Sequence, residues 1–293
     1  MTRKNTYKNT YNAMKTKFLF TLTFVLFFSN VKSYSFDGLL FKPLTANHLE
    51  SRIGFFYQPD TENLRLDIGH SLDMYEFFSD KNSDKNLTVR AGGDFFILSR
   101  LRSDGKMKFP VETSDFYFGL NGSAMWKSVF FDKIDCSMRL RIAHISSHLV
   151  DGYTFQRDDT TFFREAPFVY SREFADLIFA YNFENYFRFY IGGTYIFSTI
   201  PRDVNKFVPQ FGFDFQIPIY RFVDIFGGYD FKLQGSETLV NCGMNSLQAG
   251  ILFNLSKNIG ISLNYYYYSG YSIHGMFYNQ KDNYNGFGIQ INY

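Results

Sequence analysis

The sequence predicts an all-β protein, an antiparallel up-and-down transmembrane β-barrel of about 12 strands of the outer-membrane type. Three observations lead to this prediction. Apolar and aromatic residues alternate with polar ones in segment after segment, short connections alternate with long ones, and the chain begins with an export signal. Together they indicate strands that turn one face to lipid and the other to the inside of a barrel.

The alternation is clearest between Tyr186 and Leu255. Phe187, Phe189 and Ile191 share one face of the first strand there, and Arg188 lies on the other face, whose residues are largely polar or small. A soluble β-sandwich or carbohydrate-binding module would also alternate. Strands of roughly ten residues, with Phe, Tyr, Ile and Leu on one face and charges on the other, favour a barrel in lipid.

Composition excludes several other classes. Aromatic residues make up 21% of the 293 residues, yet no run of about twenty apolar residues occurs beyond the N-terminus, so spanning helices are not expected. The net charge is only +2 and no basic tract occurs, which argues against a nucleic-acid partner. Cys136 and Cys242 are expected to be free thiols.

The N-terminus has the pattern of a secretory signal peptide, residues 1–33. A polar, basic start precedes the apolar block 18–28, and Val31 and Ser33 stand at the −3 and −1 positions of a cleavage site. Met14 is an alternative start, and an uncleaved anchor helix is the alternative interpretation. The expected organisation is this signal peptide, a periplasmic lead-in at 34–50 and the barrel at 51–293.

The connections between the expected strands carry a second signal. Those after strands four, six, eight and ten are short, whereas the others are longer, apart from a comparatively long turn at 79–86. This asymmetry is typical of bacterial outer-membrane barrels, with short turns in the periplasm and long loops outside. The expected strands are 51–57, 64–75, 87–98, 115–126, 129–148, 174–183, 186–198, 207–217, 221–233, 246–255, 259–268 and 284–293.

Charges on the polar faces are expected to point into the lumen, where both signs occur in similar numbers and can pair across strands. We therefore expect a mostly plugged interior, with a narrow solute-selective pore as the alternative. These residues are Arg65, Asp67, Asp73, Arg90, Asp94, Arg139, Arg141, Arg188, Asp214, Asp224, Asp230 and Lys232.

The last expected strand carries Phe287, Ile289, Ile291 and the terminal Tyr293 on one face. An aromatic final residue on an amphipathic strand resembles the signal by which the outer-membrane assembly machinery recognises its clients. The expected partners are therefore this machinery and outer-membrane lipid, and the expected location is the bacterial outer membrane.

One group of residues on the fifth expected strand could carry out a reaction. His144, Ser146 and His148 alternate along strand five, so an extended strand projects their side chains to one side, opposite Arg139 and Arg141. If the arginines face the lumen, this side is the outer wall of the barrel near its extracellular rim. A histidine beside a serine can activate the hydroxyl as a nucleophile, and lipid would be within reach.

His144-Ile145-Ser146 resembles the His-x-Ser core of outer-membrane phospholipase A, a twelve-stranded barrel with its catalytic residues on the lipid-facing side. It is more loosely similar to the His-x-Ser of lipid A deacylases. The sequence departs from the phospholipase pattern, because Ser147 and His148 stand where Asn and Gly follow the serine. The next expected strand also shows no counterpart of that family's orienting asparagine.

A broader resemblance covers about residues 40–293. The stretch H-I-S-S-H-L-V-D-G-Y, the Ser171-Arg172-Glu173 before strand six, and the segments Y-Y-S-G-Y-S-I-H-G-M-F-Y and G-F-G-I-Q-I-N-Y look like a family of exported bacterial barrels classed as a domain of unknown function. This resemblance implies the fold and the compartment and no activity.

The first hypothesis for function is a structural or solute-transport barrel without catalytic activity, in which His144, Ser146, Ser147 and His148 form a hydrogen-bonded rim cluster. The alternative is a lipid-acting serine ester hydrolase with His144, Ser146 and Asp151 as catalytic residues. Metal binding through His144, His148 and Asp151 is a third interpretation. It requires a bent strand, because the two histidines are about 13 Å apart when extended. No cofactor and no metal are expected, and His70 and His274 receive no role.

Overall fold

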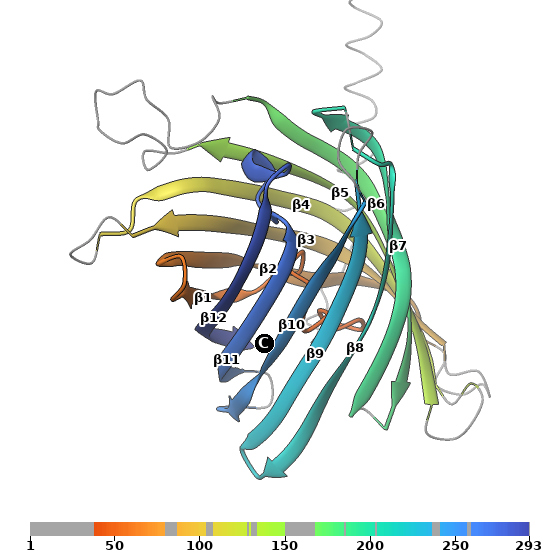
Figure 1. Ribbon diagram of the computed structural model, residues 1–293. Coiled ribbons are helices and arrows are strands. Elements are labelled where there is room, and N and C mark those ends of the chain that lie inside the picture. The colour runs from red at the N-terminus through yellow and green to blue at the C-terminus, as the bar shows by residue number, and fades with distance from the viewer. Residues whose placement is uncertain are drawn as a thin grey trace, which may run out of the picture. The chain divides into compact units, whose positions relative to one another are not determined.

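The computed structural model describes residues 38–79, 87–103, 108–127, 129, 134–149, 168–184, 186–202, 204–235, 241–256 and 259–292. Over these residues, twelve antiparallel strands close into a barrel, which confirms the predicted fold class (Figure 1). The strands are β1 Ile53–Gln58, β2 Asn63–Ser79, β3 Leu87–Arg102, β4 Val111–Trp126, β5 Ile134–Leu149, β6 Tyr170–Phe183, β7 Phe187–Ile200, β8 Phe207–Tyr220, β9 Val223–Gln234, β10 Cys242–Asn254, β11 Gly260–Tyr271 and β12 Lys281–Asn292.

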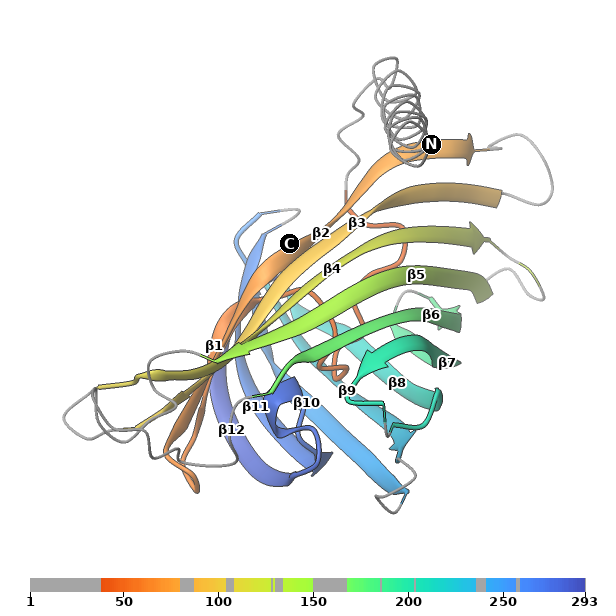
Figure 2. The same ribbon diagram turned by 90° about the horizontal axis from the view of Figure 1, so that it is seen from above.

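Each strand pairs with its neighbours in sequence, and β1 pairs with β12 to close the ring. The closing pair is in register from Ile53 opposite Ile291 to Tyr57 opposite Phe287. We call the end where β1 begins and β12 ends the turn end, and the opposite end the loop end. The connection 221–222 lies at the turn end, while the loop end carries 59–62 and 272–280. Figure 2 shows β2 to β5, the longest strands, running side by side in one wall.

Strand five differs from the prediction at its start. It was expected to begin at residue 129 after a two-residue turn, but β5 begins at Ile134, and the Val129 amide donates to the Ile134 carbonyl at 3.0 Å. The expected strand included the apolar run Val129-Phe130-Phe131, which has no polar residue between its members. Apolarity without alternation does not identify a membrane-spanning strand.

The two faces of the wall have opposite character, as the alternation predicted. Large apolar side chains on the outward face are exposed, for example Phe189 at 51% and Ile191 at 63%, while Arg65, Asp67 and Arg141 on the inward face are buried. Within the described ranges, no helix is long and apolar enough to cross a membrane. The two cysteines are free, as expected.

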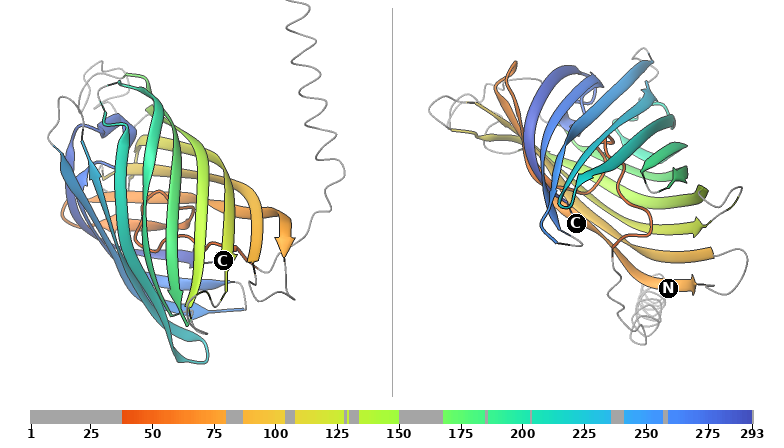
Figure 3. Two further views of the ribbon diagram at one scale, coloured as in Figure 1. Left: turned by 90° about the vertical axis from the view of Figure 1, so that its right-hand side faces the viewer. Right: turned by 90° about the horizontal axis from the view of Figure 1, so that it is seen from below.

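Residues 38–52, which we call the inner segment, contact inward-facing side chains from strands around the barrel, and Figure 3 shows this red-to-orange stretch within the ring. The hydrogen bonds run from Arg139 Nη1 to Glu50 Oε2 at 2.9 Å, Arg188 Nη2 to the Pro43 carbonyl at 2.8 Å, Lys232 Nζ to Asn47 Oδ1 at 2.8 Å and Ser246 Oγ to the Ala46 carbonyl at 2.6 Å. Charged side chains of the strands point into the interior, and residues of the inner segment accept many of their hydrogen bonds.

A second, apolar layer fills the loop end. The short 3-10 helix η2, Gly275–Phe277, places Met276 and Phe277 against inward-facing apolar side chains. We call this group the capping cluster; it includes Phe96, Leu98, Tyr117, Ala143, Ile145, Tyr170, Phe174, Ile196, Val204, Val208, Met276 and Phe277. Phe96 and Tyr117 stack with ring centroids 4.1 Å apart. The interior therefore has a polar layer and an apolar layer, like the core of a soluble domain.

Candidate functional site on the outer wall

Strand β5 presents His144, Ser146 and His148 on the outward face near the loop end. The intervening residues Ala143, Ile145 and Ser147 are buried toward the interior. Pairing with β4 sets the neighbours, because Phe118 lies opposite His144 and Phe116 lies opposite Ser146.

His144 is held by two contacts. Its Nδ1 lies 3.0 Å from Glu173 Oε1, and since an ionised carboxylate only accepts, the nitrogen donates. The imidazole also stacks on Phe118, with centroids 5.4 Å apart and an interplanar angle of 7°. A histidine held through Nδ1 by a carboxylate has Nε2 as its unprotonated nitrogen when it is neutral.

Ser146 bonds to the other histidine. Its Oγ lies 3.3 Å from His148 Nε2, and the His148 ring meets Phe116 edge to face at 5.4 Å between centroids. The serine hydroxyl is thus within reach of a base, at a distance that is common in the absence of substrate.

Glu173 is the residue that the sequence analysis missed. It lies on β6 directly opposite His144, and Ser171 donates to its Oε1 at 3.2 Å. The predicted strand began at residue 174, because Ser171, Arg172 and Glu173 are all polar and show no alternation. The spacing of Ser171 and Glu173, two apart like His144 and Ser146, was the available signal. We call His144, Ser146, His148, Ser171 and Glu173 the outer-wall cluster.

The position of the cluster is chemically unusual. The side chains of His144 and Glu173 are 34% and 35% exposed, on a face otherwise rich in apolar residues. Ionisable residues that face lipid are rare because they are costly, and they mark functional sites by default. The cluster contains two hydrogen-bonded groups, His144 with Glu173 and Ser146 with His148. A serine, an imidazole base and a carboxylate are the kinds of group that nucleophilic catalysis uses.

Two of the predicted residues lie elsewhere. Ser147 points to the interior, where its hydroxyl donates to Asp115, so it is not part of the outer-wall cluster. Asp115 also accepts from His274 Nδ1 at 2.7 Å and from the Gly275 amide at 2.9 Å, and it thereby ties η2 to β4. Asp151 lies outside the described residues.

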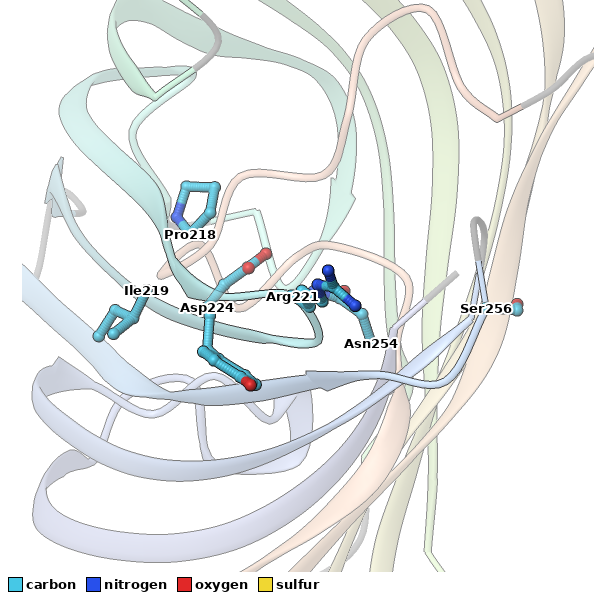
Figure 4. A pocket seen from close by; sticks show the side chains of 7 residues that line it. Pro218, Ile219, Arg221, Asp224, Asn254 and Ser256 are labelled. Carbon is cyan, nitrogen blue, oxygen red and sulfur yellow. The ribbon is translucent and has the colours of Figure 1, made fainter.

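The remaining candidate features are weaker. Among the described residues, no group of three or more His, Cys, Asp or Glu side chains could hold a metal ion. A shallow open cavity of about 870 Å³ lies at the turn end, away from the outer-wall cluster, and none of its lining residues is a histidine or cysteine (Figure 4). Its lining comprises Pro218, Ile219, Tyr220, Arg221, Asp224, Asn254 and Ser256.

Comparison with known proteins gives a family. Residues 74–293, most of the chain, match the model of the family described as "Protein of unknown function (DUF1207)". The chain belongs to this family. The match includes the outer-wall cluster and confirms the expected membership; the family's description states no activity. No curated protein matches the sequence.

Solved structures with similar folds are outer-membrane barrels. An active-site mutant of outer membrane phospholipase A from Escherichia coli matches with a TM-score of 0.54 at 11% identity, over 89% of this chain and 95% of that one. The Salmonella typhi outer membrane phospholipase, a dimer with bound calcium, matches with a TM-score of 0.52 at 11% identity, over 87% of this chain and 94% of that one. At this identity the likeness concerns the fold, which is that of bacterial outer-membrane proteins.

Proposed function

We propose that this family member is a lipid-acting serine ester hydrolase of the bacterial outer membrane, with Ser146 as the nucleophile. One observation supports the proposal: the hydrogen-bonded pair Ser146–His148 lies beside the pair His144–Glu173 on the outward face of the barrel, where lipid is the solvent. The fold of the phospholipases named above, whose printed names state their substrate, agrees with this choice.

The depth of the outer-wall cluster suits an acyl ester. Ser146 is about 10 Å of extended chain from the end of β5, and less in depth because barrel strands are tilted. With the loop end outside the cell, the proposal places Ser146 at the boundary between headgroups and hydrocarbon, where the acyl esters of an outer-leaflet lipid lie. The ester carbonyl can then reach Ser146 without leaving the membrane.

A lipid-release assay tests the proposal. Detergent-folded protein is mixed with phospholipid micelles and fatty acid is measured over time. Wild type is expected to release fatty acid, and Ser146→Ala is expected to lose this release. Ser269→Ala is the matched control, because Ser269 lies on the outward phase of β11 near the loop end and outside the outer-wall cluster. Equal release by wild type and Ser146→Ala would contradict the proposal.

The second candidate is a structural barrel without catalysis. It is favoured by the filled interior and by the hydrogen bond between His144 and Glu173, which links β5 to β6 near the loop end. Solute transport receives less support, because the inner segment and the capping cluster leave the lumenal charges buried. For a structural barrel, Ser146→Ala would change no lipid chemistry.

A further inference from the structure

The outer-wall cluster holds two histidines beside one serine, and their contacts differ. Ser146 Oγ bonds to His148 Nε2 at 3.3 Å, whereas His144 is engaged by Glu173 at 3.0 Å and by the face of Phe118. Between His144 and Ser146 no hydrogen bond occurs in the part of the chain that the structure describes. A serine flanked on both sides in this way has two possible proton acceptors.

We propose that His148 takes the proton of Ser146 and that His144 is a positioning residue. This assignment deepens the proposed hydrolase and rests on it. His148 is the imidazole whose Nε2 already meets the hydroxyl, so proton transfer needs no rearrangement. Glu173 and Phe118 instead fix the His144 ring beside the serine, which limits the space that a bound lipid can occupy.

The steps balance with two protons moving through His148. Ser146 Oγ forms a bond to the ester carbonyl carbon while its proton moves to His148 Nε2. The tetrahedral intermediate then loses the alcohol oxygen, the C–O bond breaks, and His148 returns the proton to that alcohol. In the second half, water attacks the acyl carbon and gives a proton to His148. The bond between the acyl carbon and Ser146 Oγ then breaks, fatty acid leaves, and His148 returns the proton to Ser146 Oγ.

The geometry gives each histidine a different expected phenotype. Loss of a general base costs about 100-fold to 10,000-fold in rate, so His148→Gln is expected to lose at least about 100-fold. His144→Gln keeps a polar side chain opposite Glu173, and a loss under about 10-fold is expected from poorer positioning. If His148 had only a structural role, an added base would not restore the reaction rate of a variant that lacks the imidazole.

The test uses a fluorophosphonate probe, so that it does not depend on the choice of lipid. Ser146 Oγ forms a bond to phosphorus, fluoride leaves as the P–F bond breaks, and the base takes the serine proton. The rate of covalent labelling is measured for folded wild type, Ser146→Ala, His144→Gln and His148→Gln, with folding checked by heat-modifiable migration. His148→Gly is added with and without imidazole, because the free base can enter the vacated space.

The expected result is labelling of wild type that Ser146→Ala abolishes, that His148→Gln slows about 100-fold or more, and that imidazole partly restores in His148→Gly. A large loss in His144→Gln with a small one in His148→Gln would overturn the assignment, as would the absence of imidazole rescue. No labelling of wild type above Ser146→Ala would overturn the hydrolase as well. Labelling through His148 without fatty-acid release would overturn only the lipid substrate.

Discussion

Glu50 shows how a single residue organises the interior. Its carboxylate accepts from Arg139 Nη1 at 2.9 Å and lies 3.5 Å from Arg141 Nη1, and all three side chains are buried. Asn47 Nδ2 donates to it as well, at 3.0 Å. A buried charge with several partners contributes little net energy as a pair, but removal of one partner is costly because the others remain buried without compensation.

The first prediction follows from this arrangement. Glu50→Gln keeps the shape of the side chain and removes the charge that faces two guanidinium groups, so the free energy of unfolding is expected to fall by about 3 to 5 kcal/mol. The free energy of unfolding is measured by urea titration in detergent, with the loss of heat-modifiable migration as the readout. Glu62→Gln is the control, because Glu62 is exposed between β1 and β2 and its change should stay within about 0.5 kcal/mol. Equal stability of the two variants would contradict the prediction.

The second prediction concerns pH. Burial alone would raise the pKa of Glu50. The positive charges of Arg139 and Arg141 lower it by more than burial raises it, so that the resulting pKa is about 2 instead of the usual 4.5. A group whose pKa is depressed by folding stabilises the protein above its unfolded pKa and loses this contribution as the pH falls. The stability of wild type is therefore expected to decline more steeply than that of Glu50→Gln between about pH 4.5 and pH 2. Parallel curves for the two proteins over this window would contradict it.

For single residues, the sequence predicted which face of a strand a side chain occupies better than it predicted which residue the side chain contacts. Alternation alone assigned Arg139 and Arg141 to the lumen and His144 and Ser146 to the outer face, because a strand has a period of two. It could not assign Glu50 to the arginines, since the pair is formed by a segment without periodicity. Ser147 was grouped with His148 because the two are adjacent in sequence. Neighbouring residues of a strand point to opposite faces, so the period of two places Ser147 inside and His148 outside.

Among the elements, η2 depends on close approach. The carboxylate of Asp115 holds both His274 and the Gly275 amide, and a Cβ on Gly275 would collide with Ser147 Oγ and the ring of Tyr170. Only a residue without a side chain fits there. The sequence offered no signal for this connection, because its order comes from contacts with distant strands.

The third prediction uses this contact. Gly275→Ala is expected to displace η2 and expose the connection between β11 and β12, with a loss of about 1 to 3 kcal/mol in stability. Limited proteolysis of the folded protein measures the exposure. Gly122→Ala is the matched control, because the nearest atom to its added Cβ is at 3.9 Å, an ordinary contact. Equal proteolysis of the two variants would contradict the predicted displacement.

Strand β6 explains the main omission in the site. Three consecutive polar residues, Ser171 to Glu173, were interpreted as loop, yet the structure divides them between the two faces, with Glu173 outward and Arg172 inward. Polar residues on both faces of a strand break the alternation by which a strand is recognised in the sequence. Sequence periodicity therefore fails at the place where the candidate site lies.

For the whole molecule, the interior resembles a packed core more than a channel. The inner segment pairs with charges from β5, β7 and β9, and the capping cluster fills the loop end independently. The barrel thus supports the outer-wall cluster from behind with a rigid interior. A rigid support would matter for the proposed hydrolase, because its nucleophile and base must keep their separation.

The last prediction follows from the two layers. Full-length protein in planar bilayers is expected to carry no steady current. A variant without residues 38–50 is expected to remain closed, because the capping cluster still fills the loop end, although its stability falls as Arg139 and Lys232 lose partners. Replacing residues 273–279 by a short glycine-serine turn in the same variant removes Met276 and Phe277 from the capping cluster and is expected to open a steady conductance. Current through the first deletion alone would show that the inner segment is the sole seal.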